Sequence, residues 1–308
     1  MNPNYATAAD LFPEWKADLL SGKPPALFPI SDDERLASVE IGPGNVTLIG
    51  GPPGAGKSAF VMQLTIDALR LTTDLKAIVC NVEMPSAALL DRQLARLSGI
   101  PLTVIRYRRL TPEHGERLAF GLEALAAVAE RLAFVGRPHS FENIANAADD
   151  FAGKLIVLDY LQRIAPPGEH GNHKASVDAA MECVRRFADE GAAVVVVAAV
   201  GRSKNSSGQN AYQNLNLASF RESSELEYGA DDAYLLIRAD KDADAVLLSH
   251  VKSRNGELKD ISLRFIGANQ RFDALDDANL PDDLATAARA AWAETGKGSE
   301  EESEGGSQ

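Results

Sequence analysis

The sequence lacks the features that mark membrane and secreted proteins. No apolar run in its 308 residues reaches the roughly 18 that a transmembrane helix needs. Its first residues show no basic flank followed by an apolar core, so no secretory signal is predicted. Only two cysteines occur, Cys80 and Cys183, without metal-ligand spacing, and we expect both to be buried thiols. These absences favour a cytoplasmic protein with no membrane partner and no structural zinc.

Positive charge is also in deficit. The chain has 31 Lys and Arg against 44 Asp and Glu, a net charge of −13, and this balance argues against a nucleic-acid partner. The deficit is concentrated, because residues 273–308 hold ten acidic and two basic residues and account for −8. The rest of the chain carries −5, which is compatible with a local basic groove. Overall charge therefore does not decide whether the protein binds nucleic acid.

Three segments are expected along the chain. Residues 1–40 predict a helix on a Pro-rich tether, residues 41–272 a folded catalytic domain, and residues 273–308 an acidic, flexible C-terminal tail. The tail is interpreted as solubilising, with recruitment of a basic protein partner as the alternative.

The catalytic domain has the pattern of an α/β fold. Continuous apolar segments alternate with helical ones, which is typical of a parallel sheet covered on both faces. The buried strands are expected at residues 46–49, 77–82, 132–135, 155–158 and 193–199. Three later strands have only short connections, so antiparallel pairing is expected for them. They are residues 234–237, 246–251 and 261–265.

The N-terminal segment predicts a short amphipathic helix. Thr7 and Asp10 have the spacing of a capping box, and the segment ends at Gly22. The apolar residues at helical spacing are Leu11, Trp15, Leu19 and Leu20. A helix of this length cannot bury such a stripe alone, so it must dock on its own domain or on a neighbouring subunit.

Residues 51–58 match the phosphate-binding pattern G-x-x-x-x-G-K-[ST] completely, between an apolar strand and an amphipathic helix. The residues expected to bind the nucleotide are Gly51, Pro52, Pro53, Gly54, Ala55, Gly56, Lys57 and Ser58. Backbone N–H groups and Lys57 would contact the phosphates, and the Ser58 hydroxyl would ligate Mg²⁺. The sequence therefore predicts an ATPase whose ligands are ATP and Mg²⁺.

Two carboxylates are candidates for the chemistry beside this loop. Asp159 follows four apolar residues and is the expected carboxylate on the Mg²⁺ side. Many P-loop ATPases place a Glu directly after this Asp to orient the attacking water, but here Tyr160 follows. Another strand end must supply that group, and Glu83 is the candidate. The structural alternatives are a helix cap for Asp159 and a plain surface position for Glu83.

Four segments resemble successive motifs of the DnaB-type replicative helicases, in the same order and at similar spacing. They are residues 81–86, 158–162, 220–223 with Glu227 and Asp231, and 252–256. The resemblance covers about residues 40–272. It implies a RecA-like P-loop NTPase with a mostly parallel central sheet, flanking helices and antiparallel C-terminal strands.

The resemblance also implies a homo-oligomeric ring, usually a hexamer, with ATP at the subunit interfaces. The P-loop, Glu83 and Asp159 would then act within one subunit. Lys252 and Arg254 would project into the neighbour's site, with Arg254 as the arginine finger; an exposed basic hairpin is the alternative. The N-terminal helix is similar to the linker helix that such subunits dock on a neighbour.

Three features depart from that family. About 45 residues precede the P-loop strand, so the family's N-terminal domain, which contacts primase, is expected to be missing. The family's phosphate-sensing Gln aligns with Ala199, which cannot hydrogen-bond a phosphate through its side chain. Sensing has then moved, for example to Arg202 or Lys204, or the coupling of hydrolysis to motion is degraded.

The third departure is a scarcity of basic residues in the loops that would face a central channel. The candidates for DNA binding are Arg163, Lys174, Arg202 and Lys204. A ring repeats each loop, and backbone N–H groups can also hold phosphates; a solvated loop is the alternative. His170 and His173 are interpreted as loop residues without a metal.

The favoured function is an ATP-driven motor of the DnaB helicase type that acts on single-stranded DNA. The alternative is a KaiC-like RecA-fold ATPase that acts as a nucleotide-controlled assembly switch without helicase activity. A recombinase-like filament, which needs open rather than closed symmetry, is a third possibility.

Overall fold

The protein is represented by a computed structural model, which describes residues 5–200, 203–204, 210–211, 215, 217–220, 224–238 and 244–275. Arg202, the motif residues 221–223 and the tail from residue 276 onward lie outside these ranges. Within them, none of the helices combines the length and the apolar character needed to cross a membrane.

A nine-stranded sheet forms the centre of the molecule, in the order β11-β10-β9-β8-β1-β5-β4-β2-β3. Its parallel strands are β1 (Val46–Gly50), β2 (Ala77–Asn81), β3 (Leu132–Phe134), β4 (Leu155–Asp159), β5 (Ala193–Val197) and β8 (Asp232–Arg238). The antiparallel strands that follow β8 are β9 (Ala245–Ser253), β10 (Ile261–Ile266) and β11 (Arg271–Ala274). The predicted fold class is confirmed. β11 was not predicted, and β8 pairs with parallel β1 on one side and antiparallel β9 on the other.

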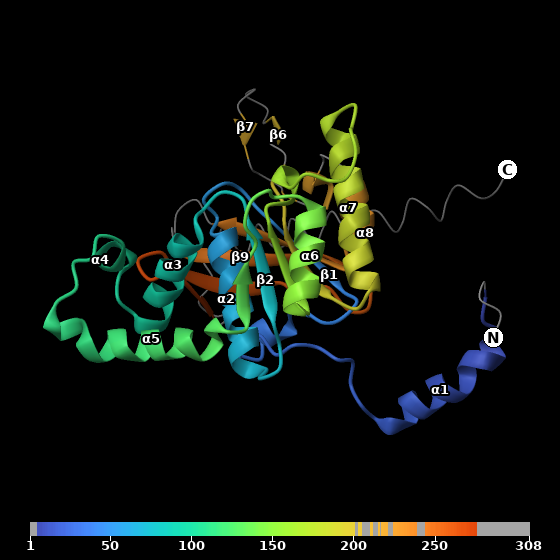
Figure 1. The fold of residues 1–308 in the computed structure, drawn as a ribbon, viewed down its shortest axis with the longest axis horizontal. Coiled ribbons are helices and arrows are strands. Elements are labelled where there is room, and N and C mark those ends of the chain that lie inside the picture. The colour runs from blue at the N-terminus through green and yellow to red at the C-terminus, as the bar shows by residue number, and fades with distance from the viewer. Residues whose placement is uncertain are drawn as a thin grey trace.

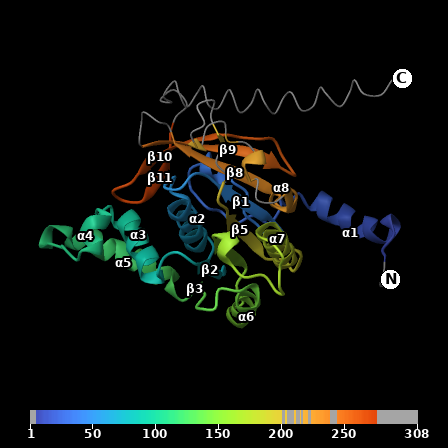
Figure 2. The same ribbon diagram turned by 90° about the horizontal axis from the view of Figure 1, so that it is seen from above.

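Helices cover both faces of this sheet (Figure 2). The helices are α1 (Ala8–Ser21), α2 (Lys57–Leu71), α3 (Ser86–Ser98), α4 (Leu102–Arg106), α5 (Gly115–Ala129), α6 (Phe141–Phe151), α7 (His173–Asp189) and α8 (Ser224–Gly229). Neighbouring strand residues enter different cores: Ile49 packs in the core with Phe60 of α2, and Leu48 in the core with Val184 of α7. Such alternation places one apolar core on each face of the sheet. A separate small sheet pairs β6 (Ser203–Lys204) with β7 (Asn210–Ala211).

α1 stands apart from the body of the protein (Figure 1). Its predicted capping box is present, since Thr7 Oγ1 accepts from Asp10 N and the Asp10 carboxylate accepts from Thr7 N. None of its residues is buried, and Trp15 and Leu20 are 56% and 73% exposed. The structure therefore does not show α1 docked on its own domain. Docking of α1 on a neighbouring subunit stays a prediction.

The two cysteines differ in burial. Cys80 in β2 is buried, and burial raises the pKa of its thiol to about 12. Cys183 in α7 is only half-buried, because it lies at the margin of the core that α7 packs against. The expectation of two buried thiols was therefore wrong for Cys183.

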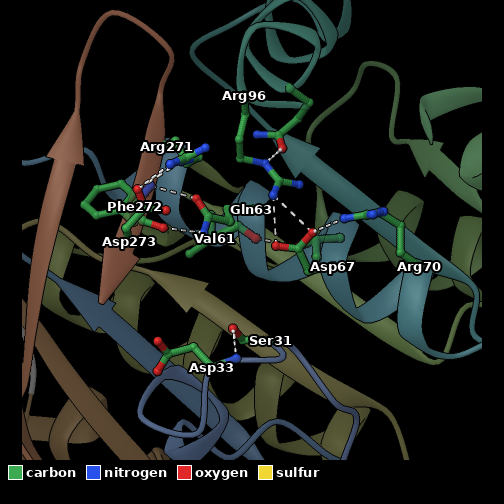
Figure 3. Close-up of polar contacts among 12 residues, drawn as sticks. Ser31, Asp33, Val61, Gln63, Asp67, Arg70, Arg96, Arg271, Phe272 and Asp273 are labelled. Atoms are coloured by element: carbon green, nitrogen blue, oxygen red, sulfur yellow. Dashed lines mark hydrogen bonds and ion pairs between the residues drawn. The ribbon is translucent and has the colours of Figure 1, made fainter. Parts of the chain in front are cut away.

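A cavity of about 480 Å³ lies between α2, α3, β11 and residues 31–36, and each arginine that lines it pairs with a carboxylate (Figure 3). The Gln63 side chain bonds both backbone groups of Phe272, which fixes β11 to α2. Arg96 of α3 donates through Nη1 to both carboxylate oxygens of Asp67, at 3.0 and 2.9 Å, and through Nε to Gln93. Arg271 pairs with Asp273 at 2.7 Å. These contacts hold α3 and the last strand onto α2.

Candidate nucleotide-binding site

The P-loop joins β1 to α2 in a conformation that requires glycine. Gly51, Gly54 and Gly56 have φ angles of 148°, 80° and 96°, which side chains strongly disfavour. A Cβ at residue 51 would also lie 2.6 Å from the carbonyl oxygen of Leu236. The backbone of the loop is thus held close to β8.

The start of α2 presents unpaired backbone donors. Phe60 N donates to Gly56 O at 2.9 Å as the first bond of the helix, so the N–H groups of Lys57, Ser58 and Ala59 have no partner inside it. Such N–H groups, together with the positive end of the helix dipole, favour a bound phosphate.

A cavity of about 450 Å³ brings together the catalytic groups that were predicted to act within one subunit. Lys57 and Ser58 reach it from α2, Glu83 from the end of β2 and Asp159 from the end of β4. They meet because the carboxyl ends of parallel strands lie along one edge of the sheet. Pro53, Gly54 and Gly56 also line this nucleotide cavity, whereas Gly51, Pro52 and Ala55 shape the loop without lining it.

Lys57 lies at the centre of the loop. Its Nζ donates to the carbonyl oxygens of Gly51 at 2.7 Å and Pro52 at 2.9 Å. Burial lowers the pKa of Lys57, and the nearby Asp159 and Glu83 act in the opposite direction. The two carboxylates thus favour the charged ammonium in a partly desolvated place.

Asp159 is a buried carboxylate, 4% exposed. Burial raises its pKa, and Glu83 raises it further, against a hydrogen bond from Ser58 and the charges of Lys57 and Arg92. A divalent cation would offset that burial. Mg²⁺ typically takes one or two protein oxygens together with phosphates, so a hydroxyl beside a buried carboxylate fits it. Among the described residues, no cluster of three or more His, Cys, Asp or Glu forms a metal site.

Asn81 contacts Asp159 and the turn that carries Glu83, a role that was not predicted from the sequence. Its Nδ2 donates to Asp159 Oδ2 at 2.5 Å, and its Oδ1 accepts from the N–H groups of Glu83 at 3.1 Å and Met84 at 2.7 Å. The β2–β4 register places Asn81 opposite Asp159. The signal in the sequence was a polar residue ending a buried strand two positions before Glu83.

Arg92 of α3 also lines the nucleotide cavity and was not predicted. Burial lowers the pKa of its guanidinium, while Asp159 acts in the opposite direction. Within the described part of the chain, its guanidinium has no hydrogen bond or ion pair. A half-buried cation of this kind is available to an anion in the cavity.

Ala199, which the resemblance predicts to replace a phosphate-sensing Gln, lines the cavity. The side chain of Gln162 brackets its backbone: Ala199 N donates to Gln162 Oε1 at 3.3 Å, and Gln162 Nε2 donates to Ala199 O at 3.4 Å. An amide side chain therefore lies beside this strand end, but it is directed at the backbone.

Lys252 and Arg254 lie away from the nucleotide cavity, at and just beyond the end of β9. Arg254 Nη1 pairs with Asp231 at 2.6 Å, and Lys252 Nζ donates to Ala230 O at 2.6 Å. The structure thus does not bring these cations to the P-loop of their own chain.

The predicted DNA-binding residues are placed in part. Arg163 and Lys174 are exposed, and Arg163 stacks over the Tyr160 ring with 5.6 Å to its centroid. Lys204 belongs to β6, and Arg202 lies outside the described residues.

Comparison with known proteins places this geometry in a family context. A sequence model of the DnaB-like helicase C terminal domain matches residues 38–274. The chain is 25% identical over 244 residues to the replicative DNA helicase DnaB of Buchnera aphidicola subsp. Schizaphis graminum (strain Sg), covering 75% of this chain and 51% of that protein. For DnaB of Pasteurella multocida (strain Pm70), the identity is 25% over 258 residues, covering 79% and 54%. The chain thus spans about half the length of these curated relatives.

Two solved structures share the fold. One is an ATPase domain that superposes with a TM-score of 0.76 at 18% identity, covering 88% of this chain and all of that one. A DnaB-like replicative helicase, described with its interactions with primase, gives a TM-score of 0.74 at 18% identity and covers 88% and 68%. The predicted RecA-like fold and the resemblance to DnaB-type helicases are confirmed, and nothing in these similarities favours the KaiC-like alternative.

Proposed function

The chain belongs to the family of the DnaB-like helicase C-terminal domain, and from that premise we propose that it is the ATP-hydrolysing motor of a ring-forming helicase acting on single-stranded DNA. The observation that carries the proposal is the nucleotide cavity, where P-loop Lys57 and Ser58 meet Glu83 and buried Asp159. This set of groups supports the proposal, because phosphoryl transfer from ATP to water uses a P-loop lysine, a carboxylate on the Mg²⁺ side and a group that orients the attacking water.

The residues of this cavity have separate roles in binding phosphate, holding Mg²⁺ and activating water. The N–H groups at the start of α2 and the Lys57 ammonium bind the β- and γ-phosphates. The Ser58 hydroxyl and the Asp159 carboxylate are the groups that would hold Mg²⁺, which neutralises charge on the phosphate oxygens when bound. Glu83 orients the attacking water and takes its proton as the water oxygen bonds to the γ-phosphorus and the bond to the β–γ bridging oxygen breaks.

The remaining cations point to a site shared between subunits. Lys252 and Arg254 lie outside the cavity of their own chain, so they can serve ATP only in a neighbouring copy. In the proposed ring, Arg254 acts as the arginine finger and Lys252 supports it. This arrangement makes hydrolysis depend on assembly.

The exposed apolar surfaces support such an assembly. α1 carries exposed apolar side chains and stands apart from the body of the protein (Figure 1). The group formed by α3, α4 and α5 projects at the other end of the molecule and exposes Tyr107, Leu110, Phe120 and Leu122. We propose that α1 of one subunit packs on the α3–α5 group of the next.

Single-stranded DNA is the proposed substrate of motion. Arg163 and Lys174 follow β4, and β6 with Lys204 follows β5, so these basic residues emerge from the same sheet edge as the nucleotide cavity. A ring would repeat them around its channel. Because phosphate contacts release counterions, binding should weaken steeply as salt rises.

ATP turnover with and without single-stranded DNA tests the proposal. We expect DNA to stimulate the wild type, Lys57→Ala to abolish turnover, and Arg254→Ala to lower it by about 10³- to 10⁵-fold. An equal mixture of the two variants should recover activity, because about a quarter of randomly formed interfaces then pair an intact P-loop with an intact finger. A protein that stays monomeric with ATP, or whose turnover ignores DNA at low salt, would contradict the proposal.

A further inference from the structure

Asp231 lies beneath the proposed finger and binds three donors at once. Its side chain is 5% exposed. Oδ2 accepts from Val46 N at 2.8 Å and from Arg185 Nη1 at 2.7 Å, and Oδ1 pairs with Arg254 Nη1 at 2.6 Å. One buried carboxylate therefore joins β1, α7 and the end of β9.

The contacts at Oδ2 fix the carboxylate independently of Arg254. Val46 belongs to β1, at the centre of the sheet. Arg185 is itself held by Asp189 at 3.2 Å and by the carbonyl of Gly229 at 3.4 Å. Oδ1 is thus presented to Arg254 by a rigid frame.

The guanidinium of Arg254 is bound to Asp231 on one side and exposed on the other. Its backbone N–H donates to Asp231 O at 2.9 Å, and its Nη1 to the carboxylate. Nη2 reaches Tyr228 O only at 3.5 Å, and 49% of the side chain is exposed. An arginine carries five N–H donors in a planar fork, so one edge can be held while the others face an anion outside the chain.

We propose that Asp231 is the positioning residue of the arginine finger. It holds the Arg254 guanidinium by one edge and aims the free donors at the triphosphate of the neighbouring subunit. This inference rests on the proposed function, because it needs a finger that acts between subunits. An ordered finger lowers the entropy lost in reaching the transition state, so its loss should reduce kcat and leave KM almost unchanged.

A competing role for Asp231 is support of its own P-loop. Its bond to Val46 N lies on the strand that leads into Gly51. The two roles predict different partners in subunit mixing, since a finger defect is repaired by subunits with good fingers and a P-loop defect by subunits with good P-loops.

The test is therefore complementation of Asp231→Asn, which keeps the shape of the side chain and removes its charge. Alone, we expect kcat to fall by about 10- to 100-fold, as for other residues that orient a catalytic group, with KM within about twofold. Mixed with Lys57→Ala, the variant should regain turnover; mixed with Arg254→Ala, it should not. In addition, Asp231→Asn should have no further effect in an Arg254→Ala background, as residues acting through one another are non-additive.

The reverse pattern, rescue by Arg254→Ala and none by Lys57→Ala, would overturn the inference and assign Asp231 to its own P-loop. Arg185→Gln is the matched control, because it removes one of the two contacts that hold Oδ2 but leaves the Val46 N–H bond and the ion pair with Arg254 in place; its kcat should fall less than that of Asp231→Asn. If Lys57→Ala and Arg254→Ala fail to complement each other, the proposed function fails first, whatever Asp231 does.

Arg254→Lys is a second variant that can be measured if Asp231→Asn does not fold. A lysine has the charge but not the fork, so it cannot be held by one edge and bind with the other. We expect it to lose at least about 100-fold in kcat, in the range seen for lost transition-state donors. Wild-type turnover in this variant would overturn the inference.

Discussion

Arg92 and Arg96 lie one turn apart on α3 and line two different cavities, which differ in whether their arginines are paired with carboxylates. Arg96 is buried and bound to Asp67 and Gln93, in a cavity whose Arg271 also has a carboxylate partner (Figure 3). Arg92 lines the nucleotide cavity together with Asp159 and Lys57, and it has no ion pair among the described residues. The same residue type is structural in one cavity and available to a ligand in the other.

This difference shows how to separate a working site from a structural cluster. Buried charges are usually paired, because desolvation costs more than a weak attraction returns. Where a buried carboxylate such as Asp159 keeps a raised pKa despite nearby cations, the fold has left charge for something else to neutralise. The cavities have similar volumes, about 450 and 480 Å³, so compensation of charge distinguishes them better than size.

Asp159→Asn, in the nucleotide cavity, should have the largest effect. It removes a proposed metal ligand, so we expect turnover to fall by more than about 10³-fold, equivalent to about 4 kcal/mol. The protein without nucleotide should nevertheless become more stable. Burial raises the Asp159 pKa above its unfolded value, so the ionised group costs stability at neutral pH and the protonated group does not.

The measurement is thermal unfolding without nucleotide from about pH 4, close to the ordinary aspartate pKa of 3.8, up to about pH 8. The advantage of Asp159→Asn over wild type should shrink as pH falls through the raised pKa, because protonation then neutralises the wild-type group as well. A variant less stable than wild type at every pH would show that Asp159 is a structural ion-pair partner.

Arg96→Met should have the next largest effect, this time on stability. It removes the buried partner of Asp67, whose side chain is 14% exposed, and leaves the more exposed Arg70 at 3.3 Å as a cationic partner. Breaking a buried pair from one side costs about 3 kcal/mol or more, and urea unfolding would measure it. Turnover per folded molecule should stay within about twofold of wild type, since Arg96 does not line the nucleotide cavity.

Arg70→Met is the matched control for that change. Arg70 is 42% exposed and pairs with the same Asp67 from the surface, so its loss should cost less than about 1 kcal/mol. Equal costs for the two variants would mean that burial does not set the value of the Arg96 pair.

The fold could be predicted from sequence wherever the signal was local. Apolar runs ending at Glu83 and Asp159, with the glycine-rich loop between strand and helix, identified both the parallel sheet and the groups at its edge. α6 was missed because its 11 residues bury few side chains, with Phe141 and Ile144 as the buried ones. β11 was missed because its charged and apolar residues alternate over only four positions, too short a run to identify a strand.

The unpredicted parts of the candidate site depend on how distant elements meet. Asn81 matters because the β2–β4 register sets it opposite Asp159, and register between strands distant in sequence is not written in either strand. Arg92 matters through the rotation of α3, and Asp231 through a contact 185 residues away in the chain at Val46. The motif segments could be found from the sequence, and two of them contain Asn81 and Asp231, but the contacts by which these two residues orient others needed the structure.

Asn81→Ala should have the smallest of these effects. In the cavity between α2, α3 and β11, the cation Arg96 holds Asp67. In the nucleotide cavity, the neutral amide of Asn81 holds Asp159 and leaves the charge of the carboxylate uncompensated. Losing that amide frees Asp159 and the turn that carries Glu83, so we expect kcat to fall by about 10- to 100-fold, the range for residues that orient metal ligands.

Asn81→Ser is the matched control for that prediction, because a hydroxyl can replace part of the hydrogen bonding, and its kcat should lie between those of wild type and Asn81→Ala. Steady-state turnover over a range of Mg²⁺ concentrations would separate the two contributions. A loss that excess Mg²⁺ repairs would trace to Asp159, and a loss that persists at saturation would trace to Glu83. Unchanged turnover in Asn81→Ala would mean that the two carboxylates are placed by the strands alone.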